Sequence, residues 1–318
     1  MVSTSDILLN NTSLLSPGSG PVCALVGCTE GIGLATLHAV LRHTSAPTIY
    51  LVGETARLDA LKTSVQSLNA SANIVPIVVT PDEGSNLVSC AQDAAREMVA
   101  LNPPRLDLLI MSSTSPSPSP SADISLTEEG IDRTICAEYC ARMRILVTLL
   151  PLLRLAASPR VVSVLAGGRE GRVDVDDLGT PRTTEPSTTA AAATMTTLFF
   201  EYLAAQVEND KIVFLHVNPG VVFGGVHTSV DEAEGGERVL FAATNGRFRR
   251  VRDPERARGT LIQQGSDGVL GSGVYLVNGD SSVVEGGGSE ELKRLRRDTG
   301  GGVVHKIWEY TMGRVCGD

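Results

Sequence analysis

The chain has 318 residues, which is enough to bury a large core and, by length alone, enough for two domains. Its 42% hydrophobic and 20% charged residues are typical of an ordinary soluble globular protein. The net charge of −9, without a long basic run, argues against nucleic acid or an anionic membrane surface as a partner.

The N-terminal apolar pieces are too short for a signal or an anchor, which predicts a cytoplasmic protein. The six cysteines show no paired Cys-x-x-Cys spacing, as expected for buried free thiols in a reducing compartment. We therefore expect a small-molecule substrate and no membrane or nucleic-acid partner. A homo-oligomer is compatible with the sequence.

The stretch from Val22 to Val40 predicts a strand, a glycine turn and a buried helix. An apolar run ends at Gly27, Gly31 follows after three residues and Gly33 two residues later, and apolar residues then recur at helical spacing. Glycine lets a bound pyrophosphate approach the backbone, and the amides at the helix start face the anion. The alternative is that the glycines merely make a tight turn. Their place between a strand and a helix favours a nucleotide site.

Apolar runs alternate with helical stretches through the rest of the chain. Glu128 and Glu129 are expected near the start of a long helix, and Pro151 to bend or end it. Further strands are expected at residues 48–52, 74–79, 106–111, 161–165, 212–217 and 273–277. Helices are expected at residues 56–67, 84–101, 127–155, 190–207 and 303–315. This alternation predicts an α/β fold with a doubly wound parallel sheet of about seven strands.

The organisation predicted from these elements is one domain with long loops at the carboxyl edge of the sheet. Residues 1–20 are expected to form a flexible lead-in, and residues 21–318 the domain. The Ser/Pro-rich segment 112–122 is expected to be a loop at the carboxyl edge. The segment 221–260 is expected to cap a cleft, followed by a strand and a closing helix.

Several motifs together resemble the short-chain dehydrogenase/reductase family. Gly27-x-x-x-Gly31-Ile32-Gly33 is similar to the cofactor turn of that family, and Asn218-Pro219-Gly220 to the turn beside the nicotinamide. Residues 106–110 and 160–164 resemble the strands that lead to its adenine-side and catalytic motifs. Residues 193–198, 236–244 and 307–312 look like a divergent fungal branch with many members from secondary-metabolite pathways.

The resemblance implies a Rossmann-like fold and an NAD(P)-linked oxidoreductase acting on a small organic intermediate. Carried over residue by residue, it assigns cofactor contacts to positions in the glycine turn, after the second and fourth strands, and in the Pro-Gly turn. These residues are Gly27, Thr29, Gly31, Ile32, Gly33, Glu54, Ser112, Pro219 and Gly220.

The chain departs from the family at the catalytic positions. A tyrosine with a lysine four residues later should lie near Thr189 or Ala190 and near Ala193 or Thr194, but no Tyr-x-x-x-Lys occurs anywhere. In the family, the lysine lowers the pKa of the tyrosine hydroxyl that exchanges the proton.

Three more family positions are also changed. The serine that binds the substrate carbonyl should lie near Ala166, and Ser163, three residues earlier on a strand, points to the opposite face. Glu138 stands at the place of the helix asparagine, and Ser112-Ser113-Thr114 at the place of Asn-Ala-Gly. The resemblance therefore covers the fold and the turn, but the usual catalytic set is missing.

Charges near the glycine turn bear on the choice of cofactor. Glu30 and Glu54 stand where NADP users of the family often carry basic residues, and carboxylates repel a 2′-phosphate. Arg57 and Arg42 could reach that phosphate. The sequence therefore favours NAD over NADP if a dinucleotide binds, and leaves open that none does.

Other residues could carry acid–base chemistry. Glu138 and Tyr139 lie on the helix that faces the active cleft in the family, and burial of Glu138 would raise its pKa towards neutrality. Glu138 could instead be a solvated charge that pairs with Arg142 four residues on. His216, just before the Pro-Gly turn, could be a base near the cleft or a satisfied strand histidine.

Three function hypotheses follow from these residues. The first is an oxidoreductase with an unusual proton relay. The second is a non-redox isomerase, cyclase or dehydratase on the same fold, and the third is a binding protein with a vestigial cofactor site. Three aspartates at 174, 176 and 177 have no histidine nearby, which favours a solvated loop over a metal site.

Overall fold

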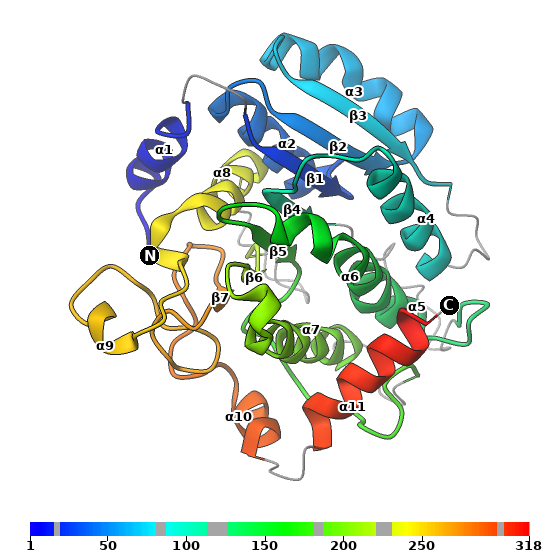
Figure 1. The fold of residues 1–318 in the computed structure, drawn as a ribbon, viewed down its shortest axis with the longest axis vertical. Coiled ribbons are helices and arrows are strands. Elements are labelled where there is room, and N and C mark those ends of the chain that lie inside the picture. Colours follow the sequence, from blue (N-terminus) through cyan, green and yellow to red (C-terminus); the bar gives the residue numbers. More distant parts are fainter. Residues whose placement is uncertain are drawn as a thin grey trace.

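The computed structural model describes residues 1–15, 20–80, 87–112, 126–180, 187–220, 231–297 and 302–317 (Figure 1). Its centre is a seven-stranded sheet in the order β3-β2-β1-β4-β5-β6-β7, and every neighbouring pair is parallel. The strands are β1 (Val22–Val26), β2 (Thr48–Gly53), β3 (Asn73–Val78), β4 (Leu108–Met111), β5 (Arg160–Val164), β6 (Val213–Val217) and β7 (Val274–Val277). The predicted doubly wound parallel sheet is confirmed.

Helices cover both faces of this sheet, as right-handed crossovers require. One face packs against α4, α6, α7 and α11, and the other against α2, α3 and α8. The helices of eight or more residues are α1 (Thr4–Thr12), α2 (Gly31–His43), α3 (Thr55–Leu68), α4 (Leu87–Ala100), α6 (Ala141–Arg154), α7 (Ser187–Ala205), α8 (Glu232–Thr244), α10 (Glu290–Arg297) and α11 (Gly302–Tyr310). Short helices are α5 (Arg133–Ile135) and α9 (Pro254–Ala257), and π-helical turns span Cys136–Cys140 and Thr311–Val315.

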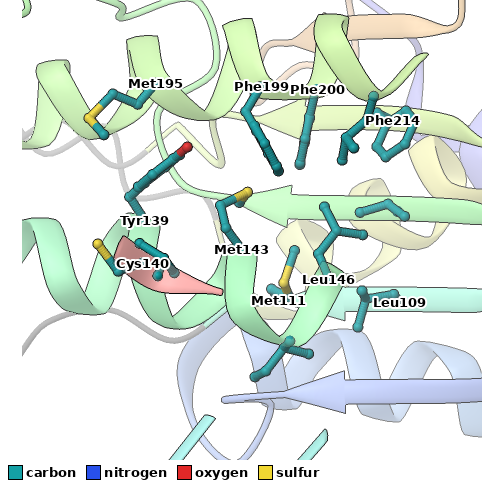
Figure 2. Close-up of a cluster of buried hydrophobic side chains, with 14 of the residues drawn as sticks. Leu109, Met111, Tyr139, Cys140, Met143, Leu146, Met195, Phe199, Phe200 and Phe214 are labelled. Atoms are coloured by element: carbon teal, nitrogen blue, oxygen red, sulfur yellow. The ribbon is translucent and has the colours of Figure 1, made fainter. Parts of the chain in front are cut away.

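The core between the sheet and helices α6 and α7 is aromatic and rich in methionine. Figure 2 shows side chains from β4, β6 and these two helices meeting in one cluster. Its labelled members are Leu109, Met111, Tyr139, Cys140, Met143, Leu146, Met195, Phe199, Phe200 and Phe214. This packing holds α6 and α7 against one face of the sheet.

The structure corrects the predicted flexible lead-in. Residues Thr4–Thr12 form helix α1, whose N-cap Ser3 accepts a hydrogen bond from the backbone of Asp6. Asn11 is fully buried and donates to the Glu237 carboxylate at 2.7 Å and to its carbonyl at 2.9 Å. The N-terminal segment is therefore part of the domain, docked on α8.

The predicted capping segment is also corrected. Helix α8 packs along α2, and a Cβ on Gly236 would lie only 2.3 Å from the Ala35 carbonyl carbon. Such close approach needs glycine, and it makes α8 part of the helix layer rather than a lid. Residues 221–230, like residues 113–122 of the predicted Ser/Pro loop, lie outside the described residues.

The long helix expected from residue 127 begins later. Asp132 caps α5 by accepting from Thr134 and Ile135, and a π-helical turn then leads into α6. Glu128 and Glu129 therefore precede the helix instead of forming its first turn. Pro151 lies inside α6, which continues to Arg154, so the proline does not end the helix. No helix in the described ranges is both long and apolar enough to cross a membrane.

Candidate functional site

The candidate site lies at the carboxyl ends of β1 and β4, which are parallel neighbours in the sheet. The strand order reverses between these two strands, and doubly wound sheets bind ligands beside the carboxyl ends of the strands at such a switch point. The glycine turn follows β1 and Ser112 follows β4, so both lie at this edge of the sheet. A Cβ on Gly33 would lie 2.7 Å from the Gly27 carbonyl oxygen and 3.2 Å from the Ser112 Cβ. Gly33 therefore allows helix α2 to approach the strands closely.

Gly31 leaves open space at the start of α2. Its φ of +51° is in the left-handed region that favours glycine, and a Cβ there would meet no described atom within 4 Å. Glu30, the N-cap residue of α2, makes no side-chain capping bond to the described part of the helix. The α2 N-terminus therefore retains the uncapped amide geometry and open approach that a phosphate needs.

The remaining turn residues take structural positions around this cradle. The Thr29 methyl lies 2.7 Å from where a Cβ on Gly53 would be, so Thr29 packs on the end of β2. Ile32 packs against Gly235 of α8. Burial raises the pKa of the Cys28 thiol to about 12, although Arg142 opposes this, so Cys28 stays protonated near neutral pH. Thr29 and Ile32 thus shape the turn, and Cys28 is no thiolate nucleophile.

Two carboxylates and one arginine lie beside the end of β2. Arg57 forms an ion pair with Glu30, and its Nε lies 3.8 Å from Glu54 Oε2. Arg42, which the sequence suggested could reach a 2′-phosphate, instead pairs with Glu237 of α8 at 3.2 Å. Arg57 is therefore already held between two acids.

The place where the resemblance puts the tyrosine and lysine is filled by a loop. Thr194 Oγ1 accepts from the Gly171 amide at 3.0 Å and lies 2.7 Å from the Gly171 carbonyl oxygen, to which it donates. A Cβ on Gly171 would lie 2.8 Å from the Ala190 Cβ. The chain after β5 therefore lies directly on the first turns of α7. At these positions the chain carries methyl and hydroxyl groups, where the resemblance implies a phenol and an ammonium.

Glu138 and Arg142 are both buried on the α6 side of the sheet. Arg142 Nη1 donates to Ser163 Oγ at 2.7 Å and to the Val164 carbonyl at 3.1 Å. Burial lowers the pKa of Arg142 to about 10, and the charge of Glu138 opposes this shift. The two residues do interact, but not as the solvated surface pair that was the simpler prediction. The Ser163 side chain therefore faces Arg142 and accepts its hydrogen bond.

Tyr139 belongs to the core cluster. It is fully buried, its ring packs edge-on against Phe199 at 6.4 Å, and its hydroxyl is hydrogen-bonded to Thr311 (Figure 2). Burial raises the pKa of Tyr139 well above its usual value. The structure therefore gives this phenol a structural role, because its ring packs in the core and its hydroxyl is hydrogen-bonded to Thr311.

His216 lies in a buried chain of hydrogen bonds. Its Nδ1 lies 2.9 Å from Thr197 Oγ1, and its Nε2 accepts from the Ala166 amide at 3.4 Å. Burial, and to a smaller extent Arg142, lowers the pKa of His216 to about 3, so the ring is neutral at pH 7. This geometry matches the satisfied strand histidine and does not place His216 against an open cleft.

Sequence reasoning missed Glu170, the other end of this chain. Thr197 Oγ1 donates to Glu170 Oε1 at 2.9 Å, and the Glu170 side chain has no exposed surface. Burial raises the pKa of this carboxyl. No motif marks Glu170, which follows two glycines in a polar loop and looks like its acidic neighbours. Only the register of α7 with this loop brings it into the site.

The Pro-Gly turn after β6 is fixed by the chain that follows β7. Gly220 has a φ of +87°, and its amide donates to Asn218 Oδ1 at 3.0 Å. A Cβ on Gly279 would lie 2.9 Å from the Gly220 Cα. Pro219 and Gly220 therefore end at the same edge of the sheet as the glycine turn.

Within the described ranges, no group of three or more histidine, cysteine or acidic side chains could hold a metal ion.

The parallel sheet and the glycine turn at its switch point define a Rossmann-like α/β fold. No family model matches the chain. The chain resembles solved structures at low identity, which shows the fold. A Mycobacterium paratuberculosis protein has a TM-score of 0.63 at 17% identity, over 96% of this chain and 97% of that one. A short-chain dehydrogenase from Pseudomonas syringae has a TM-score of 0.51 at 20% identity, over 67% and 79% of the two chains.

Relatives of known sequence narrow this class to one family. The NmrA-like family domain-containing oxidoreductase notO of an Aspergillus strain is 32% identical, over 98% of this chain and 94% of that protein. The oxidoreductase andH of Emericella variicolor is 30% identical, over 98% of this chain and 96% of that protein. The chain therefore belongs to this family of fungal oxidoreductases.

Proposed function

We propose that the protein binds NAD or NADH and acts as a nicotinamide-linked oxidoreductase on a small organic intermediate of secondary metabolism. The observation that carries the proposal is the space above Gly31, at an α2 N-terminus that Glu30 does not cap. A pyrophosphate fits there, since the backbone amides and the helix dipole both favour an anion. Membership in a family of oxidoreductases supports the same activity.

The charges at the end of β2 support NAD over NADP. Arg57 forms an ion pair with Glu30 and lies beside Glu54, so it can bind a 2′-phosphate only if it gives up its ion pair. Glu54 can accept hydrogen bonds from ribose hydroxyls, whereas it repels a 2′-phosphate. The cofactor contacts are assigned to the glycine turn, Glu54, Ser112 and the Pro219–Gly220 turn.

The chain's own residues would bind and orient the reactants. Gly27, Gly31 and Gly33 let the backbone approach the pyrophosphate, and the Pro219–Gly220 turn borders the neighbouring strand end. The bound nicotinamide would supply or accept the hydride. The loop on Ala190 and Thr194 occupies the place of the usual proton donor, so the proton must come from another group.

A non-redox reaction on the same fold is the second candidate, and the filled tyrosine–lysine place favours it. An isomerase, cyclase or dehydratase would use the pocket to position its substrate, with acid–base groups but no net hydride transfer. A binding protein with a vestigial cofactor site would retain the fold without either chemistry.

Calorimetric titration with NAD, NADH, NADP and NADPH tests the proposed function. We expect NAD and NADH to bind more tightly than the phosphorylated forms. Carbonyl and alcohol panels are then followed by the near-ultraviolet absorbance of reduced nicotinamide. Failure of all four nucleotides to bind would overturn the proposal. Tight binding with no absorbance change across both panels would favour the non-redox or binding role.

A further inference from the structure

A chain of three buried side chains crosses the carboxyl ends of β5 and β6. His216 on β6 meets Thr197 on α7 at 2.9 Å, and Thr197 meets Glu170, in the loop after β5, at 2.9 Å. The side chains of His216 and Glu170 have no exposed surface, and Thr197 is fully buried. Buried polar side chains of this kind destabilise the folded state unless they are hydrogen-bonded, so each of their polar atoms is expected to have a partner.

The hydrogen-bond donors along this chain all point towards Glu170. The Ala166 amide donates to His216 Nε2, so the hydrogen of the neutral ring lies on Nδ1 and is donated to Thr197 Oγ1. Thr197 then donates to Glu170 Oε1, which also accepts from the Gly168 amide at 3.0 Å. Glu170 Oε2 has no hydrogen-bond partner within the described ranges. A proton added to the chain is therefore accommodated at Oε2.

The surroundings of Glu170 favour its protonated form more than an exposed site would. Burial raises the pKa of Glu170, while the backbone amides of Gly168 and of Glu170 itself, the Thr197 hydroxyl and the charge of Arg296 on α10 lower it. The other titratable group that faces the carboxyl is His216, which is neutral at pH 7 because of its burial. Arg142 on α6 adds a smaller effect on His216 in the same direction as burial. Neither Thr197 nor neutral His216 carries a positive charge that would stabilise an ionised Glu170, so Arg296 acts on the carboxyl from outside these three side chains.

Glu170 is also next in the chain to the place where the resemblance puts the usual proton donor. The next residue, Gly171, packs on Ala190 and is hydrogen-bonded to Thr194, the two positions that the family gives to tyrosine and lysine. The loop that fills the missing pair's place therefore carries a buried carboxyl into the same corner of the sheet.

We propose that Glu170 holds the exchangeable proton of the site, with Thr197 and His216 as the residues that position its carboxyl. This rests on the proposed oxidoreductase function. In the reducing direction, the carbonyl carbon gains a hydride from the reduced nicotinamide and the C=O π pair moves to oxygen. That oxygen gains the proton of Glu170 Oε2, passed through a water because the carboxyl is buried. The products are the alcohol, NAD⁺ and the Glu170 carboxylate, which water from the solvent reprotonates.

Infrared titration of the whole protein tests the protonation directly. We expect the C=O stretch of a protonated carboxyl at neutral pH, lost in Glu170→Gln and displaced to another pH in Thr197→Val. Thr197→Ser, which retains the hydroxyl, should restore the titration. Glu237→Gln removes a carboxyl buried elsewhere and should leave the signal unchanged. Absence of the signal from the unsubstituted protein at neutral pH would overturn the proposal.

Turnover and cofactor binding separate this proposal from the proposed function. Glu170→Gln should bind NADH as tightly as the unsubstituted protein, while its kcat for carbonyl reduction falls by about 100-fold or more and the alkaline limb of the pH profile disappears. A variant that retains both kcat and the pH limb would also overturn the proposal. Failure of the unsubstituted protein to bind any nucleotide would instead refute the proposed function, and the infrared result would still decide the protonation state of Glu170.

Discussion

The sharpest prediction concerns a single methyl group in the glycine turn. Gly31→Ala places a Cβ in the open space at the start of α2, where we expect the pyrophosphate to lie. Gly259→Ala is a matched control, because Gly259 also has a positive φ (+75°) and a Cβ there also meets nothing described within 4 Å. Both variants carry the same kind of backbone strain, about 1–2 kcal/mol for a left-handed alanine.

The two variants should therefore lose similar stability and differ in nucleotide affinity. A displaced pyrophosphate loses at least one hydrogen bond between a backbone amide and a charged oxygen, which contributes about 1.5–3 kcal/mol. The Kd of Gly31→Ala for NADH should rise by about 10- to 100-fold, as measured by calorimetry, and that of Gly259→Ala should not change. Equal affinities in the two variants, with equal losses of unfolding free energy, would show that no phosphate lies against Gly31.

Three further predictions concern charge, pH and docking. In the double variant Glu30→Gln/Glu54→Gln, Arg57 loses its two acidic partners, so the affinity for NADPH should rise relative to that for NADH. If calorimetry finds the same ratio of NADPH to NADH affinity as in the unsubstituted protein, these carboxylates do not discriminate between the two cofactors. Because the pKa of Glu170 is raised in the folded state, the unfolded chain ionises first, and the unfolding free energy should fall by up to about 1.4 kcal/mol per pH unit between the ordinary and the raised pKa. Chemical denaturation should show that Glu170→Gln removes this slope, and an identical slope in the variant would contradict it. Asn11→Ala removes two buried hydrogen bonds, one to a carboxylate, and should cost about 2–3 kcal/mol in the same assay, whereas a loss under about 0.5 kcal/mol would mean that α1 does not dock in solution.

Local sequence patterns were sufficient for the architecture. The alternation of apolar runs with helical periodicity predicted all seven strands, and each predicted strand end lies within two residues of the observed one. This worked because the side-chain period and the turn residues are local properties of the chain. The helix start was predicted too early, at residue 127, because acids such as Glu128 and Glu129 favour a helix N-terminus in general, while the actual cap is Asp132, which accepts hydrogen bonds from two amides. The N-terminal helix was missed because its stability comes from docking on α8 rather than from its own periodicity.

The sequence by itself determined the parallel fold, the glycine turn and the absence of a Tyr-x-x-x-Lys pair, since each is a matter of residue type and spacing. The tertiary structure decided which residues occupy the place where the resemblance puts the tyrosine and the lysine. Glu170 meets Thr197 across 27 residues and Thr197 meets His216 across 19, and Asn11 meets Glu237 across 226. No local pattern encodes such contacts, because they depend on how helices and loops pack over the whole sheet. The same packing buried Glu138, Tyr139 and His216, whereas the sequence alone left open whether Glu138 and His216 face a cleft.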